Sequence, residues 1–172
     1  MNKRNIILIG MPGAGKSSVG VILAKVLGYE FIDTDLVIQH REKRLLREII
    51  ADEGNEGFLA IENEVNATLE ANKSVIAPGG SAIYGKEAME HFKEIGTIVY
   101  LKLSYEDLAK RLGNLKGRGV VLKEGQTLKD LYDERSKLYE QYAEITVDES
   151  GRDIQGLSLI HISEPTRHLR IS

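Results

Sequence analysis

The chain has 172 residues, which is enough for one domain with its own hydrophobic core and too few for two domains of usual size. Its hydrophobic fraction of 42% and charged fraction of 28% are those of an ordinary soluble globular protein. The net charge of -3 provides no basic surface for nucleic acid or an acidic membrane, and the lack of cysteine excludes disulfides, Cys-ligated zinc and a catalytic thiol.

The N-terminal apolar stretch is broken by Pro12 and neighbouring glycines too early for a signal peptide, and no other run approaches the roughly 20 apolar residues of a membrane span. We therefore expect a cytoplasmic, monomeric protein that binds neither nucleic acid nor membrane.

Short apolar runs alternate with longer amphipathic segments along the chain. The predicted strands are residues 5–9, 30–32, 74–77, 97–101 and 145–147. The predicted helices are residues 17–27, 36–41, 45–52, 56–72, 86–93, 105–112 and 128–142. This alternation predicts an α/β fold, in which a central parallel sheet of about five strands carries helices on both faces. The Gly- and Lys-rich stretch 113–126 has no period and is predicted to be a mobile lid.

The C-terminal residues 157–172 show no helical face. They resemble a translated transposase sequencing adaptor, whose reading frame gives "LSLIHISEPTR". We therefore expect a single domain over residues 1–156 and a non-native tail over 157–172 that replaces a closing helix. The alternative is a natural disordered tail.

A phosphate-binding motif follows the first predicted strand. The segment "GMPGAGKS" fits G-x-x-x-x-G-K-[ST] and opens the first predicted helix. Glycines allow the backbone N–H groups to face phosphate oxygens, and the helix N-terminus adds its positive dipole end. The expected nucleotide-binding residues are Gly10, Met11, Pro12, Gly13, Ala14, Gly15, Lys16, Ser17 and Ser18. Lys16 would reach the β- and γ-phosphates and Ser17 would ligate Mg²⁺. A glycine turn with a chance Lys-Ser pair is the ordinary alternative.

Two carboxylates, Asp33 and Asp35, interrupt the apolar run "FIDTDLVI". They follow the second predicted strand, whose carboxyl end lies at the same sheet edge as the phosphate site. Strand alternation would place both on one side, opposite Thr34. One acid would then serve the metal and the other would bond an acceptor hydroxyl. The alternatives are an N-cap role for Asp35 and an ordinary turn for Asp33.

With the phosphate motif, "DTD" and the Gly-Gly turn in "APGGSAI", residues 3–154 resemble shikimate kinase. The resemblance implies a P-loop kinase fold like that of nucleoside monophosphate kinases, and transfer of the ATP γ-phosphate to the 3-hydroxyl of shikimate, with Mg²⁺. It implies that Asp33 serves the metal and that Asp35 is catalytic and holds the acceptor hydroxyls. Gly79 and Gly80 would face the acceptor.

The resemblance also assigns three arginines. Arg118 matches the catalytic lid arginine that closes on the phosphates, Arg111 matches one near adenine, and Arg135 matches one that binds the shikimate carboxylate. The ordinary alternatives are solvated charge for Arg111 and Arg135 and loop polarity for Arg118. Phosphoryl transfer nevertheless requires cations around the transferred group.

The sequence departs from the family pattern at two positions. Leu59 in "FLAIE" stands where the family has the arginine of Phe-Arg-x-x-Glu, while Glu62 remains. Ser81 replaces the third glycine of the turn. Losing a charge-assisted bond of about 1.5–3 kcal/mol would weaken shikimate binding roughly tenfold to over a hundredfold. The candidates to replace the missing cation are Arg41, Arg44 and Arg47.

These residues together predict an ATP-dependent small-molecule kinase with shikimate as the leading acceptor. One alternative is a kinase for another polyol, a sugar acid or a nucleotide. A second is a non-catalytic nucleotide-binding module, which would have no need of Asp35, the Gly-Gly turn and Arg118 together.

Overall fold

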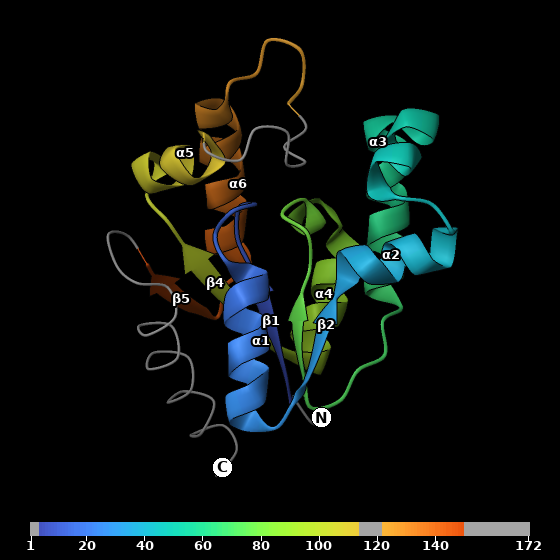
Figure 1. Cartoon of the computed structure of the whole chain (residues 1–172), viewed down its shortest axis with the longest axis vertical. Helices are drawn as coiled ribbons and strands as arrows, with labels where there is room; N and C mark the ends of the chain where they lie inside the picture. Colours follow the sequence, from blue (N-terminus) through green and yellow to red (C-terminus); the bar gives the residue numbers. More distant parts are fainter. Residues whose placement is uncertain (1–3, 114–121, 150–172) are drawn as a thin grey trace.

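Five parallel strands form one sheet in the order β2-β3-β1-β4-β5 (Figure 1). The computed structural model of the chain describes residues 4–113 and 122–149. The strands are β1 (Asn5–Ile9), β2 (Glu30–Asp33), β3 (Ser74–Ala77), β4 (Gly96–Lys102) and β5 (Ile145–Asp148). Each lies within one residue of its predicted ends, and the predicted α/β fold with a five-stranded parallel sheet is confirmed.

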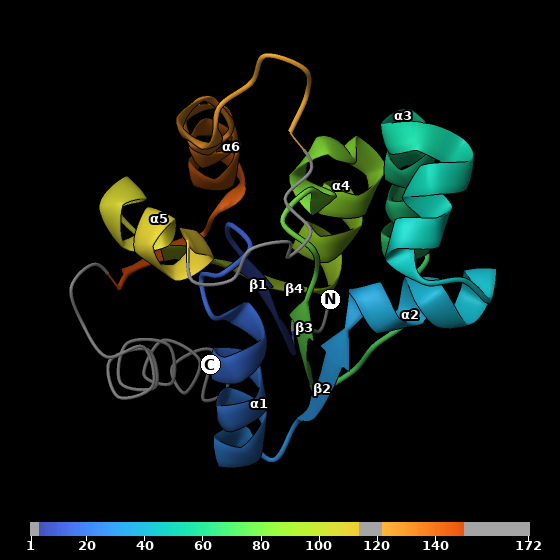
Figure 2. The ribbon, with the colours of Figure 1, turned by 45° about the horizontal axis from the view of Figure 1, so that its top comes forward.

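Helices cover both faces of the sheet (Figure 2). They are α1 (Lys16–Leu27), α2 (Thr34–Glu42), α3 (Leu46–Ala67), the 3₁₀ helix η1 (Ala82–Tyr84), α4 (Lys86–Ile95), α5 (Tyr105–Gly113) and α6 (Leu128–Tyr142). Alternation along β1 divides the core, because successive strand side chains point to opposite faces. Ile6 and Leu8 pack with the buried side of α1, whereas Ile7 and Ile9 pack with residues of α4 and α6.

Helices α2 and α3 form a separate layer beside the β2 edge of the sheet (Figure 1). They have a small core of their own, made of Ile38, Ile49, Phe58 and Val65. The acceptor-binding candidate Asp35 and the motif residue Glu62 belong to this layer, so its packing against the sheet positions them.

The structure confirms the break that the sequence predicts between helices 45–52 and 56–72 and corrects one helix end. Helix α3 contains two helical segments that meet at a kink at Gly54, which is non-helical with φ of 74° and ψ of 177°. Glycine adopts this backbone conformation at little cost, which explains the break. The helix ends at Ala67, five residues earlier than predicted, where the Thr68 hydroxyl donates to the Glu64 carbonyl at 2.8 Å.

The start of α6 is fixed by its first turn. The Thr127 hydroxyl accepts from the Asp130 N–H at 3.1 Å, and the Asp130 carboxylate accepts from the Thr127 N–H at 3.0 Å. This reciprocal pair is a capping box. It sets the register in which Leu131, Arg135 and Tyr139, one turn apart, share the buried face of the helix.

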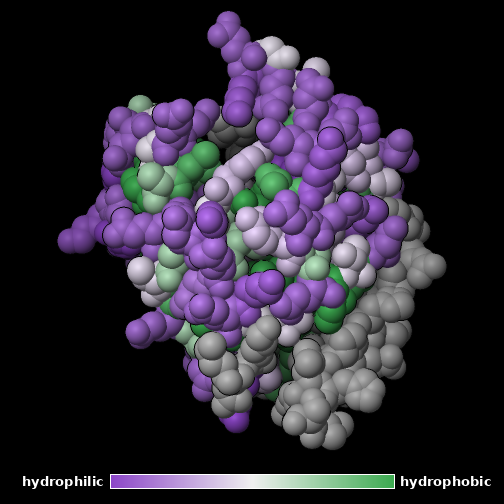
Figure 3. Space-filling model, turned by 180° about the vertical axis from the view of Figure 1, so that it is seen from behind, coloured by the Kyte–Doolittle hydropathy of each residue, from purple (hydrophilic) through white to green (hydrophobic). Residues whose placement is uncertain are grey.

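Figure 3 shows the molecule from behind the view of Figure 1. On this face the described residues are mostly hydrophilic, with smaller hydrophobic areas between them. In the part of the chain that the structure describes, no helix combines the length and apolarity that crossing a bilayer requires. The predicted lid is described only in part, because residues 114–121 fall outside the described residues, as does the tail at 157–172.

Candidate active site

The phosphate loop joins β1 to α1 and depends on glycine conformations. Gly13 and Gly15 both have φ of 88°, in the left-handed region. A Cβ atom on Gly10 would lie 2.8 Å from the carbonyl oxygen of Leu101, on the neighbouring strand. The loop can therefore adopt this path only with glycine at these positions, as the motif predicted.

Lys16 begins α1 and turns its side chain back into the loop. Its Nζ atom donates hydrogen bonds to the carbonyl oxygens of Gly10 at 2.7 Å and Met11 at 3.0 Å. Burial lowers the pKa of Lys16 to about 8, against the opposing effect of the Asp35 and Asp33 carboxylates. The amine is thus mostly protonated at neutral pH and lies where a phosphate group would meet the loop.

The two acids occupy the turn from β2 into α2. Asp33 ends the strand and caps the helix, because its carboxylate accepts from the Asp35 N–H at 2.9 Å. The alternative in which Asp35 is the cap is therefore wrong. Strand alternation is also the wrong reason for their proximity, since Thr34 is already helical. The strand-to-helix turn places both acids close enough to Lys16 to influence its pKa.

Asp35 faces the turn that follows β3. A Cβ atom on Gly79 would lie 3.0 Å from Oδ1 of Asp35 and 3.0 Å from Oε2 of Glu62. Burial raises the pKa of Asp35, and the nearby Asp33 carboxylate raises it further, while Lys16 opposes both. The absent side chain of Gly79 therefore leaves space between two carboxylates from different helices.

Gly80 lies between Pro12 of the phosphate loop and Arg135 of α6. A Cβ atom on Gly80 would lie 2.7 Å from Cδ of Pro12 and 3.1 Å from one terminal nitrogen of Arg135. The Tyr139 hydroxyl donates to the Gly80 carbonyl oxygen at 2.6 Å. Sequence reasoning missed Tyr139, although its place four residues after Arg135 puts both on one helical face.

Arg135 is buried, with 8% of its surface exposed, so the solvated-charge alternative does not apply to it. Its guanidinium carbon lies 5.6 Å from the centre of the Tyr84 ring, and its Nε atom has no hydrogen-bond partner among the described residues. A buried arginine with an unused donor beside the Gly-Gly turn is suited to an anionic group of a ligand.

Of the two other arginines, Arg111 contacts the phosphate loop. It extends from α5, and one terminal nitrogen donates to the Gly13 carbonyl oxygen at 3.2 Å. Arg118 falls outside the described residues, so its predicted role as the lid arginine stays a prediction.

The position of the replaced arginine is apolar. Leu59 is half-buried on α3 and packs against the small core of the α2–α3 layer. Glu62, one turn further, is 2% exposed, and burial raises its pKa to about 7. The Ser81 hydroxyl donates to Oε1 of Glu62 at 2.7 Å and opposes this rise. Of the two positions that depart from the family pattern, Ser81 contacts Glu62 directly and Leu59 precedes it by one turn of α3.

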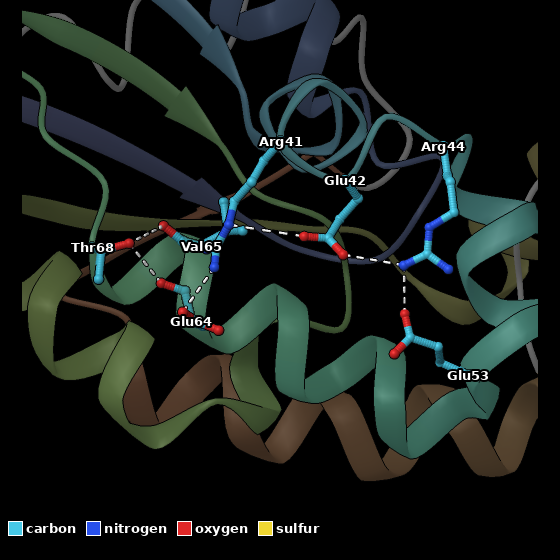
Figure 4. A network of polar contacts seen from close by, with 7 residues as sticks. All are labelled: Arg41, Glu42, Arg44, Glu53, Glu64, Val65 and Thr68. Carbon is cyan, nitrogen blue, oxygen red and sulfur yellow. Dashed lines mark hydrogen bonds and ion pairs between the residues drawn. The ribbon is translucent and has the colours of Figure 1, made fainter.

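Arg41 and Arg44 are engaged with acids of α2 and α3 (Figure 4). Arg41 binds Glu64 at 2.8 Å, and Arg44 binds Glu42 at 3.1 Å and Glu53 at 2.5 Å. The structure therefore does not offer either of these arginines as a replacement for the missing cation, and Arg47 is exposed to solvent.

The residues that could bind a metal are those of the phosphate loop and the first acid. Within residues 4–113 and 122–149, no group of three or more His, Asp or Glu side chains could hold a metal ion by itself. Mg²⁺ in kinases usually binds substrate phosphates, water and one or two protein ligands. The exposed hydroxyl of Ser17 and the carboxylate of Asp33 fit that limited requirement.

Comparisons with known proteins agree with this site. The model of the shikimate kinase family matches residues 12–161. Shikimate kinase 2 of Yersinia enterocolitica is 34% identical over 154 residues, which cover 84% of this chain and 86% of that protein.

Solved structures give the same result. Shikimate kinase from Acinetobacter baumannii in complex with shikimate has a TM-score of 0.78 and 32% identity, covering 98% of this chain and 93% of that one. The Aquifex aeolicus enzyme has a TM-score of 0.76 and 29% identity, covering 98% and 99%. With its phosphate loop, paired acids and Gly-Gly turn brought together and a match over most of its length, the chain belongs to the shikimate kinase family.

Proposed function

We propose that the protein transfers the γ-phosphate of ATP to the 3-hydroxyl of shikimate. The observation that carries this proposal is the position of Asp35. Its carboxylate raises the pKa of Lys16 in the phosphate loop. Its Oδ1 atom also lies 3.0 Å from the point where a Cβ atom of Gly79 would be, in the acceptor turn. A hydroxyl bound to Asp35 would therefore lie beside the phosphate that Lys16 holds, as direct transfer requires.

On the donor side, backbone N–H groups of the non-proline residues of the loop 10–18 would bind the phosphates, and Lys16 would neutralise charge on the transferred group. Arg111 would lie near the adenine, and Arg118 would close on the phosphates. Ser17 and Asp33 would hold Mg²⁺, which supplies further charge neutralisation when bound.

On the acceptor side, Asp35 would orient the 3-hydroxyl and accept its proton. Its raised pKa makes it a better base than an exposed aspartate. Arg135 would bind the shikimate carboxylate, because it is a buried cation with an unused donor. Backbone groups of Gly79 and Gly80 would face the ring, since neither residue has a side chain of its own.

The same proposal includes one domain over residues 1–156 that acts as a monomer in the cytoplasm, with a tail over 157–172 that takes no part in catalysis. The adaptor-like sequence of the tail supports the domain boundary at residue 156 and the expectation that the tail takes no part in catalysis. A chain that ends at residue 156 should retain the KM and kcat of the full chain.

The test is an ADP-release assay with shikimate and with a panel of other acceptors, namely quinate, gluconate and a nucleoside monophosphate. We expect ADP release that depends on shikimate and is lost in Asp35→Asn. Glu64→Gln, an exposed acid of α3 outside the site, is the control that should behave as wild type.

One observation favours a second candidate. Leu59 removes a cation from the acceptor side, and a polyol without a carboxylate at that place would suit this change. Turnover of another panel member but not of shikimate would support this candidate, whereas no acceptor-dependent ADP release at all would support a nucleotide-binding module.

A further inference from the structure

The departure at Ser81 contacts Glu62, which lies one helical turn from the departure at Leu59. Glu62 is 2% exposed, yet its Oε2 atom has no hydrogen-bond partner among the described residues. Its other oxygen, Oε1, accepts from the Ser81 hydroxyl at 2.7 Å. A buried carboxylate with one oxygen held and the other unused is costly unless a ligand completes it.

The unused oxygen points into the acceptor site. Oε2 of Glu62 and Oδ1 of Asp35 each lie 3.0 Å from the point where a Cβ atom of Gly79 would be, so they are at most twice that distance apart. Carboxylate oxygens accept hydrogen bonds, and neighbouring hydroxyls of a polyol can donate to two acceptors at such a separation.

The surroundings of Glu62 contain both signs of charge. Asp35 raises its pKa, while Arg135 and Lys16 lower it. Arg135 approaches Gly80 from the other side of the turn. The site therefore offers two hydrogen-bond acceptors on one flank and one cation on the other.

We propose that Ser81 replaces the missing arginine as the partner that orients Glu62, and that Glu62 thereby binds a second hydroxyl of the acceptor through Oε2. This inference rests on the proposed function and deepens it. It assigns Glu62 to substrate specificity and Ser81 to positioning, and it limits acceptors to compounds with two hydroxyls close together and an anionic group for Arg135.

The first test uses Glu62→Gln and Ser81→Ala. In the glutamine variant, the carbonyl oxygen would take the Ser81 bond, so an NH₂ donor would meet the substrate hydroxyl. The shikimate KM should rise roughly tenfold with kcat nearly unchanged. Ser81→Ala should also raise KM, and Glu64→Gln should leave it unchanged.

The pH profile separates positioning from a general structural role. The Ser81 bond lowers the pKa of Glu62, so its removal should move the acid limb of shikimate kcat/KM to higher pH. Glu62→Gln should remove the contribution of this carboxyl to that limb, whereas a loosened fold would leave its midpoint in place.

Two further experiments test whether Glu62 binds a hydroxyl of the acceptor and whether Ser81 replaces the family arginine. Either 4-deoxyshikimate or 5-deoxyshikimate should bind wild type more weakly than shikimate does, with a much smaller difference in Glu62→Gln. Ser81→Gly should raise KM, and adding Leu59→Arg should lower it again, because an arginine at 59 would resume the orienting role.

The outcomes are distinguishable. No shikimate turnover by wild type overturns the proposed function, and this inference falls with it. Efficient turnover with unchanged KM and pH profile in Glu62→Gln and Ser81→Ala overturns this inference alone. Melting curves establish that each variant is folded before its kinetics are compared.

Discussion

The donor half and the acceptor half of the site differ in the parts of the chain that form them. The donor half is one contiguous loop whose shape comes from glycine backbone conformations and whose cation, Lys16, belongs to the same segment. The acceptor half is assembled from side chains of α2, α3 and α6 around the turn after β3. The first half keeps its family motif intact, whereas the second has exchanged two residues, Leu59 and Ser81, of which Ser81 contacts the Glu62 carboxylate.

This difference indicates how each half tolerates change. A phosphate loop is fixed by backbone geometry, so substitutions there remove the function. An acceptor site held by several side chains can exchange partners, as Ser81 and Leu59 illustrate around Glu62.

The largest effect is expected in the donor half. Lys16→Ala should lower turnover at least about a hundredfold, because the amine that neutralises the transferred phosphate is lost. Initial rates of ADP release measure the effect, and circular dichroism checks the fold. Lys25→Ala, at an exposed position of the same helix, is the matched control. Wild-type turnover in Lys16→Ala would end the kinase interpretation.

The next effect lies in the acceptor half. Arg135→Met should raise the shikimate KM roughly tenfold to a hundredfold, since a charge-assisted bond to a carboxylate is lost while the apolar stem is kept. The KM for ATP should change far less. Lys137→Met, exposed on the same helix, should alter neither constant. An unchanged shikimate KM in Arg135→Met would show that Arg135 does not bind the carboxylate.

Restoring the family arginine at position 59 directly tests the effect of its replacement by leucine. Leu59→Arg should improve shikimate binding by up to about 1.5–3 kcal/mol, mostly in KM, because the carboxylate lies away from the reacting hydroxyl. Its stability should fall by about 1–2 kcal/mol, because Leu59 packs against the α2–α3 core. Leu59→Met keeps the packing without the charge and serves as control. Unchanged KM in Leu59→Arg would mean that the site already has the cation it needs.

The smallest predicted effect is on stability against pH. Burial raises the folded-state pKa of Glu62 from 4.5 to about 7, so between these values the folded state binds more protons than the unfolded state. The contribution of Glu62 is therefore fully present below about pH 4.5 and is lost as pH rises through about 7. It amounts to about 1–3 kcal/mol.

Denaturant unfolding at pH 5.5 and pH 7.5 measures this dependence. Glu62→Gln should show a smaller loss of stability between the two pH values than wild type, whereas Glu64→Gln should not. An identical pH dependence in wild type and Glu62→Gln would contradict the assigned pKa.

The sequence predicted what depends on local pattern. The alternating apolar and amphipathic segments and the phosphate-loop glycines act within short stretches of chain, and the structure has both of them. The break at Gly54 was also predicted, whereas the prediction was less accurate for the end of α3, which lies at Ala67 and not at residue 72.

The acceptor side depends on contacts between distant segments, which a single sequence does not reveal. The Ser81 bond to Glu62 spans 19 residues and the Tyr139 bond to Gly80 spans 59. Leu59 and Ser81 could each be recognised as departures, but the contact of Ser81 with Glu62 became visible only once α3 was packed against the turn after β3.

The most direct test of the central claim is phosphorus NMR of wild-type protein with ATP, Mg²⁺ and shikimate. The account predicts a phosphomonoester resonance that grows in equal amount with ADP and corresponds to shikimate 3-phosphate. Formation of ADP and inorganic phosphate alone, at the same rate with and without shikimate, would contradict it.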